Sequence, residues 1–281
     1  MNLIDKKLLL SANINDLIPV DIRYPSGKND MPAVFILHGF KAWKDWGFFP
    51  YISEKIASTG AIVITISFSL NGVPAGSDLY IESEKFANNT VSREIADSNT
   101  VLNSFLNNEL FDKDNLWNGE IYFLGHSRGA AISILLAASR NEINRLILWA
   151  SISRFGRIST RFKDNYLKIG YVEFKDTRTG INLKMNKVYT DDLEVNKDNF
   201  NLTAKISELS VPILLLHGTQ DVTVPAKESI ELYEKVKMSN NTKLVLIEHA
   251  GHTFGINHPF ESSNDVLEEV LSNTIDFIKS T

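Results

Sequence analysis

The sequence of 281 residues contains no cysteine. Disulfide bonds, thiolate metal sites and a cysteine nucleophile are therefore excluded. The 6 histidines include no H-x-x-x-H pair and have no carboxylate partner at metal-ligand spacing, so we predict no metal site and no cofactor.

Long apolar runs are also missing. The N-terminal stretch MNLIDKKLLLSANINDLIPV has only a short apolar run and carries acidic residues, unlike a signal peptide. No stretch approaches the roughly 18 consecutive apolar residues of a membrane span. The sequence therefore predicts a soluble, cytoplasmic protein. It leaves the oligomeric state open.

The charge has little excess of either sign. There are 29 basic and 34 acidic side chains, a formal net charge of −5. A polyanion such as nucleic acid is therefore not expected as a partner, because such a partner favours a strongly basic surface.

Short apolar runs alternate with segments of helical length along most of the chain. Runs this continuous are typical of strands buried on both faces, as in a parallel sheet covered by helices. The alternation predicts an α/β fold with one doubly wound sheet, preceded by an antiparallel edge pair in 7–11 and 17–25. The expected buried strands are 33–38, 61–68, 120–125, 145–150, 212–218 and 243–248. The expected helices are 47–58, 90–107, 127–140, 225–238 and 265–279.

Residues 151–207 interrupt this alternation with polar and aromatic sequence. Within them, residues 171–186 alternate apolar and polar around a turn at Asp176–Gly180, which predicts a half-exposed hairpin. A long insertion among short connections is commonly functional, so we interpret 151–207 as a lid on a single domain spanning residues 1–281. Residues 151–190 carry nine basic and three acidic side chains. This excess leads to the hypothesis that the lid attracts an anionic substrate; a solvated lid surface is the alternative.

The stretch YFLGHSRGAA, residues 122–131, joins an expected strand to an expected helix. Ser127 lies at the turn between them, with Gly125 and Gly129 on either side. A serine in so tight a turn has strained backbone geometry, and larger side chains at the two glycine positions are expected to collide with it. The pattern predicts that Ser127 is a nucleophile.

Asp221, His252 and Phe40 each follow an expected buried strand. Because the carboxyl ends of parallel strands meet at one edge of a sheet, we expect these residues to lie close to Ser127. A serine hydroxyl needs a base to take its proton and a carboxylate to orient that base, roles that we assign to His252 and Asp221. The backbone N–H groups of Phe40 and Arg128 are expected to form an oxyanion hole.

Some of these assignments have alternatives. His249 and His258 compete with His252 for the role of base, and Asp221 is also a typical turn-forming residue. His38 is expected to form a hydrogen bond within the loop that contains Phe40.

Two further residues are candidates for contact with substrate. One is His126, next to the serine, and the other is Trp43 or a neighbour in the aromatic stretch AWKDWGFFPY, residues 42–51. The alternative for that stretch is that Trp46, Phe48 and Phe49 only seat the first helix on the sheet.

The order of Ser127, Asp221 and His252, with the stretches GHSRG, HGF and AGH, resembles the α/β-hydrolase superfamily. Within it, the sequence is most similar to serine esterases related to dienelactone hydrolases and to cinnamoyl or feruloyl esterases. The resemblance extends from about residue 6 to residue 279 and implies an α/β-hydrolase fold. It also implies a serine triad, with oxyanion donors at Phe40 and Arg128. True dienelactone hydrolases use a cysteine nucleophile, and the HGGG loop of the hormone-sensitive lipase group is missing, so the resemblance does not identify a substrate.

Hydrolysis of a small-molecule carboxylic ester through an acyl-enzyme is the function that we predict first. Thioester hydrolysis uses the same triad and stays open. Peptide or amide hydrolysis also stays open, although an aminopeptidase usually needs an acidic site for the free amine and the insertion is basic. A non-catalytic binding protein on a hydrolase scaffold is a further class, but it predicts a broken triad and no part is missing here.

Overall fold

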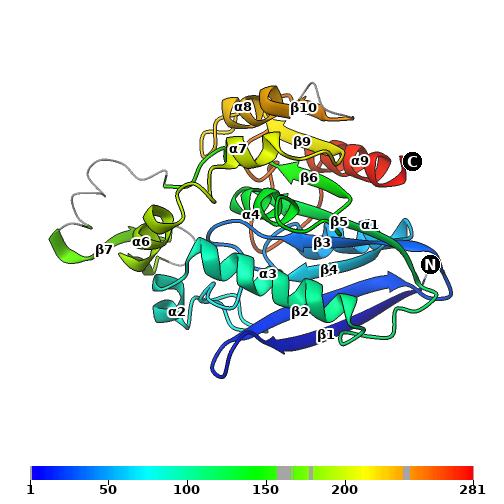
Figure 1. Cartoon of the computed structure of the whole chain (residues 1–281), viewed down its shortest axis with the longest axis horizontal. Coiled ribbons are helices and arrows are strands. Elements are labelled where there is room, and N and C mark those ends of the chain that lie inside the picture. The colour runs from blue at the N-terminus through cyan, green and yellow to red at the C-terminus, as the bar shows by residue number, and fades with distance from the viewer. Residues whose placement is uncertain (1, 157–165, 167, 177–179, 237–240, 281) are drawn as a thin grey trace.

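The computed structural model of the chain describes residues 2–156, 166, 168–176, 180–236 and 241–280. It contains an eight-stranded sheet in the order β1-β2-β4-β3-β5-β6-β9-β10. Neighbouring strands from β4 to β10 are parallel, whereas β2 is antiparallel to both β1 and β4. Helices cover both faces of the sheet (Figure 1). The predicted α/β fold and its antiparallel edge pair are confirmed.

The strands of the large sheet are β1 (Leu3–Ser11), β2 (Leu17–Pro25), β3 (Met31–Leu37), β4 (Ile62–Ile66), β5 (Trp117–His126), β6 (Arg145–Trp149), β9 (Ile213–Gly218) and β10 (Lys243–Ile247). The helices are α1 (Phe49–Ser58), α2 (Ser83–Ala87), α3 (Val91–Leu106), α4 (Arg128–Ala137), α6 (Val188–Val195), α7 (Leu202–Ser207), α8 (Lys227–Val236) and α9 (Asp265–Lys279). None of the described helices is both long enough and apolar enough to cross a membrane.

The expected strands and helices of the main sheet lie within a few residues of their predicted bounds. The sequence did not indicate the short helices α2, α6 and α7. An amphipathic pattern needs a window of about 11–18 residues to be recognised, and these helices have 5, 8 and 6 residues.

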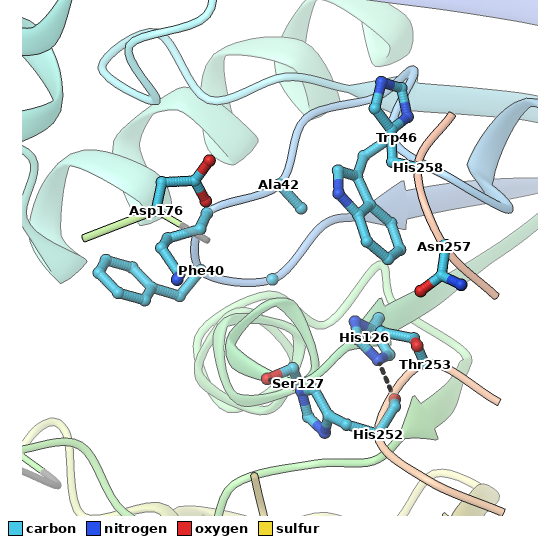
Figure 2. Close-up of a pocket in the computed structure, with 12 residues that line it drawn as sticks. Phe40, Ala42, Trp46, His126, Ser127, Asp176, His252, Thr253, Asn257 and His258 are labelled. Atoms are coloured by element: carbon cyan, nitrogen blue, oxygen red, sulfur yellow. Dashed lines mark hydrogen bonds between the residues drawn. The ribbon is translucent and has the colours of Figure 1, made fainter. Parts of the chain in front are cut away.

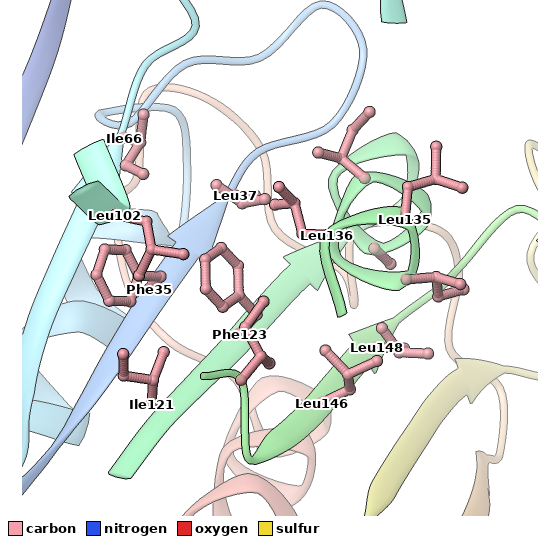
Figure 3. Close-up of a cluster of buried hydrophobic side chains, with 14 of the residues drawn as sticks. Phe35, Leu37, Ile66, Leu102, Ile121, Phe123, Leu135, Leu136, Leu146 and Leu148 are labelled. Carbon is pink, nitrogen blue, oxygen red and sulfur yellow. The ribbon is translucent and has the colours of Figure 1, made fainter. Parts of the chain in front are cut away.

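The two faces of the sheet are packed by different helices because successive side chains of a strand point to opposite sides. Phe35 on β3 lies opposite Phe123 on β5, and their rings stack at 4.9 Å on the face covered by α3, α4 and α8. Figure 3 shows both rings with Leu102 of α3 and Leu136 of α4. Ile36 and Leu124, the next residue on each strand, pack on the other face with α1 and α9. The core therefore has two layers, and it holds the central strands in register up to their carboxyl ends.

The insertion 151–207 contains a separate two-stranded sheet made of β7 (Tyr171–Lys175) and β8 (Asn182–Asn186). The strands are antiparallel and pair Tyr171 with Asn186, at the residues where the sequence predicts a hairpin. The N–H of Gly180 donates to the carbonyl of Asp176 at 2.8 Å across the connection. Residues 177–179 and 157–165, which carry part of the basic excess, lie outside the described residues. In Figure 1, β7 and α6 of the insertion lie at one end of the molecule, beside α2 and α3, whereas α7 lies beside α8.

Candidate active site

Ser127 occupies a sharp turn between the end of β5 and the start of α4. Its backbone has a φ of 56° and a ψ of −117°, which is rare for a residue with a side chain and costs about 1–3 kcal/mol. The turn is held from both sides. The N–H of Ser127 donates to the carbonyl of Trp149 at 2.7 Å, and the carbonyl of Ser127 accepts from the N–H of Ala130 at 3.1 Å.

Gly125 and Gly129 allow this turn to pack against its neighbours. A Cβ atom on Gly125 would lie 2.3 Å from the carbonyl oxygen of Gly129, and a Cβ atom on Gly129 would lie 2.3 Å from that of Leu37. Both distances are far below a van der Waals contact, so larger side chains do collide here. The collisions are with the main chain of Gly129 and of Leu37, and not with the serine as expected.

The three side chains expected to form a triad lie in a row, each within hydrogen-bond distance of the next. The Nε2 atom of His252 lies 3.0 Å from the Oγ atom of Ser127, and its Nδ1 atom lies 2.7 Å from Oδ2 of Asp221. His252 and Ser127 both line the cavity drawn in Figure 2. The serine follows β5, the aspartate follows β9 and the histidine follows β10. The order of strands in the sheet therefore brings together residues that are far apart in the chain.

Asp221 is oriented by main-chain groups as well as by histidine. Its Oδ1 atom accepts hydrogen bonds from the N–H groups of Thr223 and Val224 at 2.9 and 2.8 Å. Its Oδ2 atom lies 3.2 Å from Nε2 of the buried His217. Burial acts to raise the pKa of the Asp221 carboxyl, but the hydrogen bonds from His217, His252 and Val224 hold that pKa below its usual value. The carboxylate is therefore ionised and fixed in direction.

The other two histidines considered as the base make different contacts. The Nδ1 atom of His249 lies 3.1 Å from the side-chain amide of Gln220. The Nδ1 atom of His258 accepts a hydrogen bond from the N–H of Gly47 at 3.0 Å. The imidazole that contacts Ser127 is that of His252.

The loop after β3 carries the Gly39–Phe40 peptide next to the serine. His38 is 3% exposed. Its Nε2 atom accepts from the N–H of Phe68 at 3.1 Å, so its Nδ1–H donates to the carbonyl of Gly39 at 2.8 Å. Burial lowers the pKa of His38 to about 4, which keeps this tautomer neutral. In a trans peptide the N–H points opposite to the carbonyl, so His38 sets the direction of the Phe40 N–H.

The second expected oxyanion donor is the first N–H of α4. The N–H groups of the first helical turn have no acceptor within the helix, and that of Arg128 directly follows Ser127. A Cβ atom on Gly39 would lie 3.0 Å from Cβ of Ser127. The loop after β3 and the start of α4 therefore both lie next to the serine.

His126, the residue before the serine, holds the loop that carries His252. The residue is 5% exposed, and its Nε2–H donates to the backbone carbonyl of His252 at 2.9 Å, the dashed line in Figure 2. Burial lowers the pKa of His126 to about 3, with a smaller contribution from the nearby His252. The residue lines the cavity, as expected of a substrate contact, and it also has this positioning contact.

Two cavities meet at Ser127, and His252 lines both of them. One has a volume of about 410 Å³ and includes Trp46, and we call it the Trp46 cavity. The other has a volume of about 540 Å³ and includes Tyr189, and we call it the Tyr189 cavity. Both volumes are typical of sites for small molecules.

Trp43 does not belong to either wall. Its side chain is 2% exposed and packs in a buried cluster with Tyr80, Phe86 and Leu183. The neighbouring Trp46 lines a cavity instead. The aromatic stretch therefore contributes to the site through a residue three positions beyond the one we selected.

A buried ion pair beside the serine was not expected from the sequence. The Nε and Nη2 atoms of Arg128 donate to the carboxylate of Glu94 on α3 at 2.9 and 2.6 Å. The guanidinium lies 5.1 Å from the ring centres of both Phe40 and Tyr189. No local pattern indicates this pair, because its two members are 34 positions apart.

The described residues contain no group of three or more His, Asp or Glu side chains placed to hold a metal ion. Around Ser127, this part of the chain supplies a serine hydroxyl, an imidazole, a carboxylate and main-chain N–H groups.

Residues 108–264 match the model of a family described as the BAAT and acyl-CoA thioester hydrolase C-terminal domain. This match covers more than half of the chain. No curated protein matches the chain.

Solved structures of α/β hydrolases resemble this fold over nearly its full length. Est1E from Butyrivibrio proteoclasticus is 17% identical, with a TM-score of 0.70 and 97% of each chain covered. The α/β hydrolase GrgF from Penicillium sp. sh18 is 16% identical, with a TM-score of 0.72 over 99% of this chain and 98% of that one. Mouse α/β hydrolase domain-containing protein 10 is 16% identical, with a TM-score of 0.68 over 97% of this chain and 98% of that one. The α/β-hydrolase fold expected from the sequence is confirmed.

Proposed function

Because the chain belongs to the family of BAAT and acyl-CoA thioester hydrolase C-terminal domains, we propose that it is a hydrolase that cleaves carboxylic esters with Ser127 as its nucleophile. The observation that carries this proposal is the chain of hydrogen bonds from Asp221 through His252 to Ser127, which ends on a serine in a strained strand-to-helix turn. Such a serine, in reach of an oriented base, is the arrangement that nucleophilic catalysis requires.

In the proposed first half-reaction, Nε2 of His252 takes the proton from Oγ of Ser127 as Oγ bonds to the carbonyl carbon of the ester. The carbonyl π electrons move to the oxygen, which the N–H groups of Phe40 and Arg128 stabilise. Each such donor is worth about 10²–10³ in rate. His252 then donates the proton to the leaving oxygen as the carbon–oxygen bond breaks. The alcohol departs and an acyl-enzyme remains.

In the second half-reaction, a water molecule gives its proton to His252 and attacks the acyl carbon. The proton returns to Oγ of Ser127 as the acid is released. Asp221 stays ionised throughout and stabilises the imidazolium that forms in each half-reaction. His252 takes up one proton and gives it back in each half-reaction, so no step of this mechanism uses a cofactor.

Thioester hydrolysis is the second candidate, and the family match favours it. The same attack on a carbonyl carbon releases a thiol instead of an alcohol, and a thiolate leaves more easily than an alkoxide because its conjugate acid has a lower pKa. The ratio of kcat/KM for butyryl-coenzyme A to kcat/KM for 4-nitrophenyl butyrate separates the two candidates. A ratio far above one favours the thioester, and no detectable turnover of the coenzyme A substrate excludes it.

We further propose that the insertion 151–207 forms one wall of the substrate site in a single catalytic domain. Ile152, Phe155, Met185 and Tyr189 support this proposal, because they line the Tyr189 cavity together with the serine. Deletion of β7 and β8 is expected to change the preference among ester substrates more than it changes the reactivity of the serine toward a fluorophosphonate.

The nucleophile is tested by comparing Ser127→Ala with Ser139→Ala. Ser139 follows the same helix and is exposed, and among the described residues its hydroxyl donates only to main-chain carbonyls of α4. Its replacement is therefore a matched control. We expect the wild type and Ser139→Ala to hydrolyse 4-nitrophenyl butyrate and to take up one fluorophosphonate per chain, and Ser127→Ala to do neither. Labelling of Ser127→Ala at another residue, or its turnover at the wild-type rate, contradicts the proposal.

A further inference from the structure

The Tyr189 cavity differs in charge from the Trp46 cavity. Lys41, Arg128 and Arg154 are among the residues that line the Tyr189 cavity, and no Asp or Glu is among the described residues of its wall. Lys41 also lines the Trp46 cavity, but the wall of that cavity includes Asp176 and neither arginine. Both cavities are open to Ser127, so a substrate attached at the serine has one side in a cationic environment.

Arg128 is held rigidly in the wall of the Tyr189 cavity. Its side chain is 7% exposed, and the carboxylate of Glu94 accepts hydrogen bonds from its Nε and Nη2 atoms. The rings of Phe40 and Tyr189 flank the guanidinium at 5.1 Å. A guanidinium oriented in this way loses little conformational entropy when it binds a further group.

One nitrogen of this guanidinium, Nη1, does not contact Glu94. The Nη1 atom of Arg128 forms no hydrogen bond with any residue in the part of the chain that the structure describes, while Arg128 lines the cavity. Glu94 balances the charge of Arg128, so the net positive charge of the wall comes from Lys41 and Arg154. Arg128 adds directional N–H donors, which suit the planar oxygens of a carboxylate.

We propose that the Tyr189 cavity is a subsite for a carboxylate carried by the substrate, next to the ester that Ser127 attacks. This inference rests on the proposed function and narrows it to esters with an anionic substituent. Arg128 donates from Nη1 to one carboxylate oxygen, and Arg154 and Lys41 supply the positive field that draws the anion into the cavity. The carboxylate belongs either to the acyl group or to the alcohol, and substrates distinguish the two sources.

The test compares ester pairs that differ only in this charge. For the acyl side, the pair is 4-nitrophenyl hydrogen adipate and 4-nitrophenyl hexanoate, which have acyl chains of equal carbon number. For the alcohol side, the pair is 4-carboxyphenyl hexanoate and phenyl hexanoate. The measured quantity is the ratio of kcat/KM for the anionic ester to kcat/KM for the neutral ester, so differences in intrinsic reactivity cancel when variants are compared.

Arg154→Gln and Arg128→Lys are the test variants, and Lys187→Gln is the control. Lys187→Gln also removes one positive charge from the insertion. The exposed side chain of Lys187 pairs with Asp191 and is outside the described wall of the Tyr189 cavity. We expect the ratio for one ester pair to fall about threefold or more in Arg154→Gln, which is exposed and screened, and about tenfold in Arg128→Lys. Lysine keeps a positive charge beside Glu94 but cannot span the carboxylate of Glu94 and that of the substrate.

The outcomes separate the subsite from the proposed function. A fall confined to the adipate pair assigns the carboxylate to the acyl group, and a fall confined to the carboxyphenyl pair assigns it to the alcohol. If the wild type hydrolyses the neutral esters and the ratio of anionic to neutral ester is the same in the wild type and in both test variants, the subsite is refuted and the ester hydrolase is not. Neutral esters that the wild type does not hydrolyse at all refute the proposed function itself. A fall as large in Lys187→Gln shows long-range attraction only and also refutes the subsite.

Discussion

Removal of the Glu94 carboxylate is expected to destabilise the protein strongly. Glu94→Leu leaves the Arg128 guanidinium charged in a site where the two side chains are 7% and 4% exposed. The substitution deletes the acceptor of the Nε and Nη2 atoms, and also that of the Asn89 side-chain amide, which donates to Glu94 at 2.8 Å. The guanidinium cannot lose its proton at any ordinary pH.

The expected magnitude follows from this uncompensated charge. Breaking a buried ion pair on one side costs about 3–5 kcal/mol. For a protein of this size, 1 kcal/mol corresponds to about 2–4 °C in Tm, so a decrease of about 10 °C is expected. The double variant Glu94→Leu/Arg128→Met removes both charges and keeps apolar volume, and it is expected to recover most of the lost free energy of unfolding.

The assay is urea unfolding followed by tryptophan fluorescence, with the free energy of unfolding taken from the midpoint at constant slope. Glu142→Leu is the control, because it makes the same substitution in the exposed pair of Glu142 with Arg140. That pair is expected to contribute less than about 1 kcal/mol.

Two results contradict this reasoning. One is a loss in Glu94→Leu no greater than that in Glu142→Leu. The other is a double variant as unstable as the sum of Glu94→Leu and Arg128→Met, because the two losses then do not arise from one shared pair.

Three further predictions concern the triad, the neighbouring histidine and the turn. Asp221→Asn is expected to lower kcat for 4-nitrophenyl butyrate by about 10³–10⁴, because the histidine loses its orientation and the imidazolium its counter-charge; a loss below tenfold contradicts the role of Asp221. The pKa of His126 is lowered from 6.5 to about 3, so between these values the unfolded state binds more protons and stability falls as the pH falls. His126→Gln is therefore expected to lose less free energy of unfolding between pH 6.5 and pH 5 than the wild type, by up to about 2 kcal/mol, and parallel pH profiles contradict this. Gly125→Ala places a Cβ atom 2.3 Å from a main-chain oxygen and is expected to cost about 3 kcal/mol or more in thermal unfolding, whereas Gly251→Ala, where a Cβ meets nothing within 4 Å, is expected to cost less than about 1 kcal/mol and serves as the control.

The main elements of the fold were predictable because their signals are local. Apolar runs such as 120–125 form strands with both faces buried, and the helices between them are long enough to show their period. The turn at Ser127 was predictable for the same reason, since the strand, the two glycines and the helix are contiguous. The short helices and the bonds to Glu94 carry no such local signal.

The residues expected to contact substrate show what a local sequence pattern cannot predict. Trp43 and Trp46 are three positions apart in one aromatic stretch, and either is compatible with the sequence. The structure buries Trp43 against Tyr80 and Phe86, and leaves Trp46 at a cavity. This choice depends on packing with segments far along the chain.

The amino-acid order by itself determined an α/β sheet and a serine in a strand-to-helix turn. It also placed an aspartate and a histidine after later strands. Each of these features depends on neighbours within about twenty positions. The tertiary structure alone decided that β5, β6, β9 and β10 lie side by side, which brings Ser127 and His252 to 3.0 Å. It also decided that Arg128, in the wall of the Tyr189 cavity, is paired with Glu94. Such contacts join residues 34 to 125 positions apart, and they form only when the whole sheet and its helices are packed.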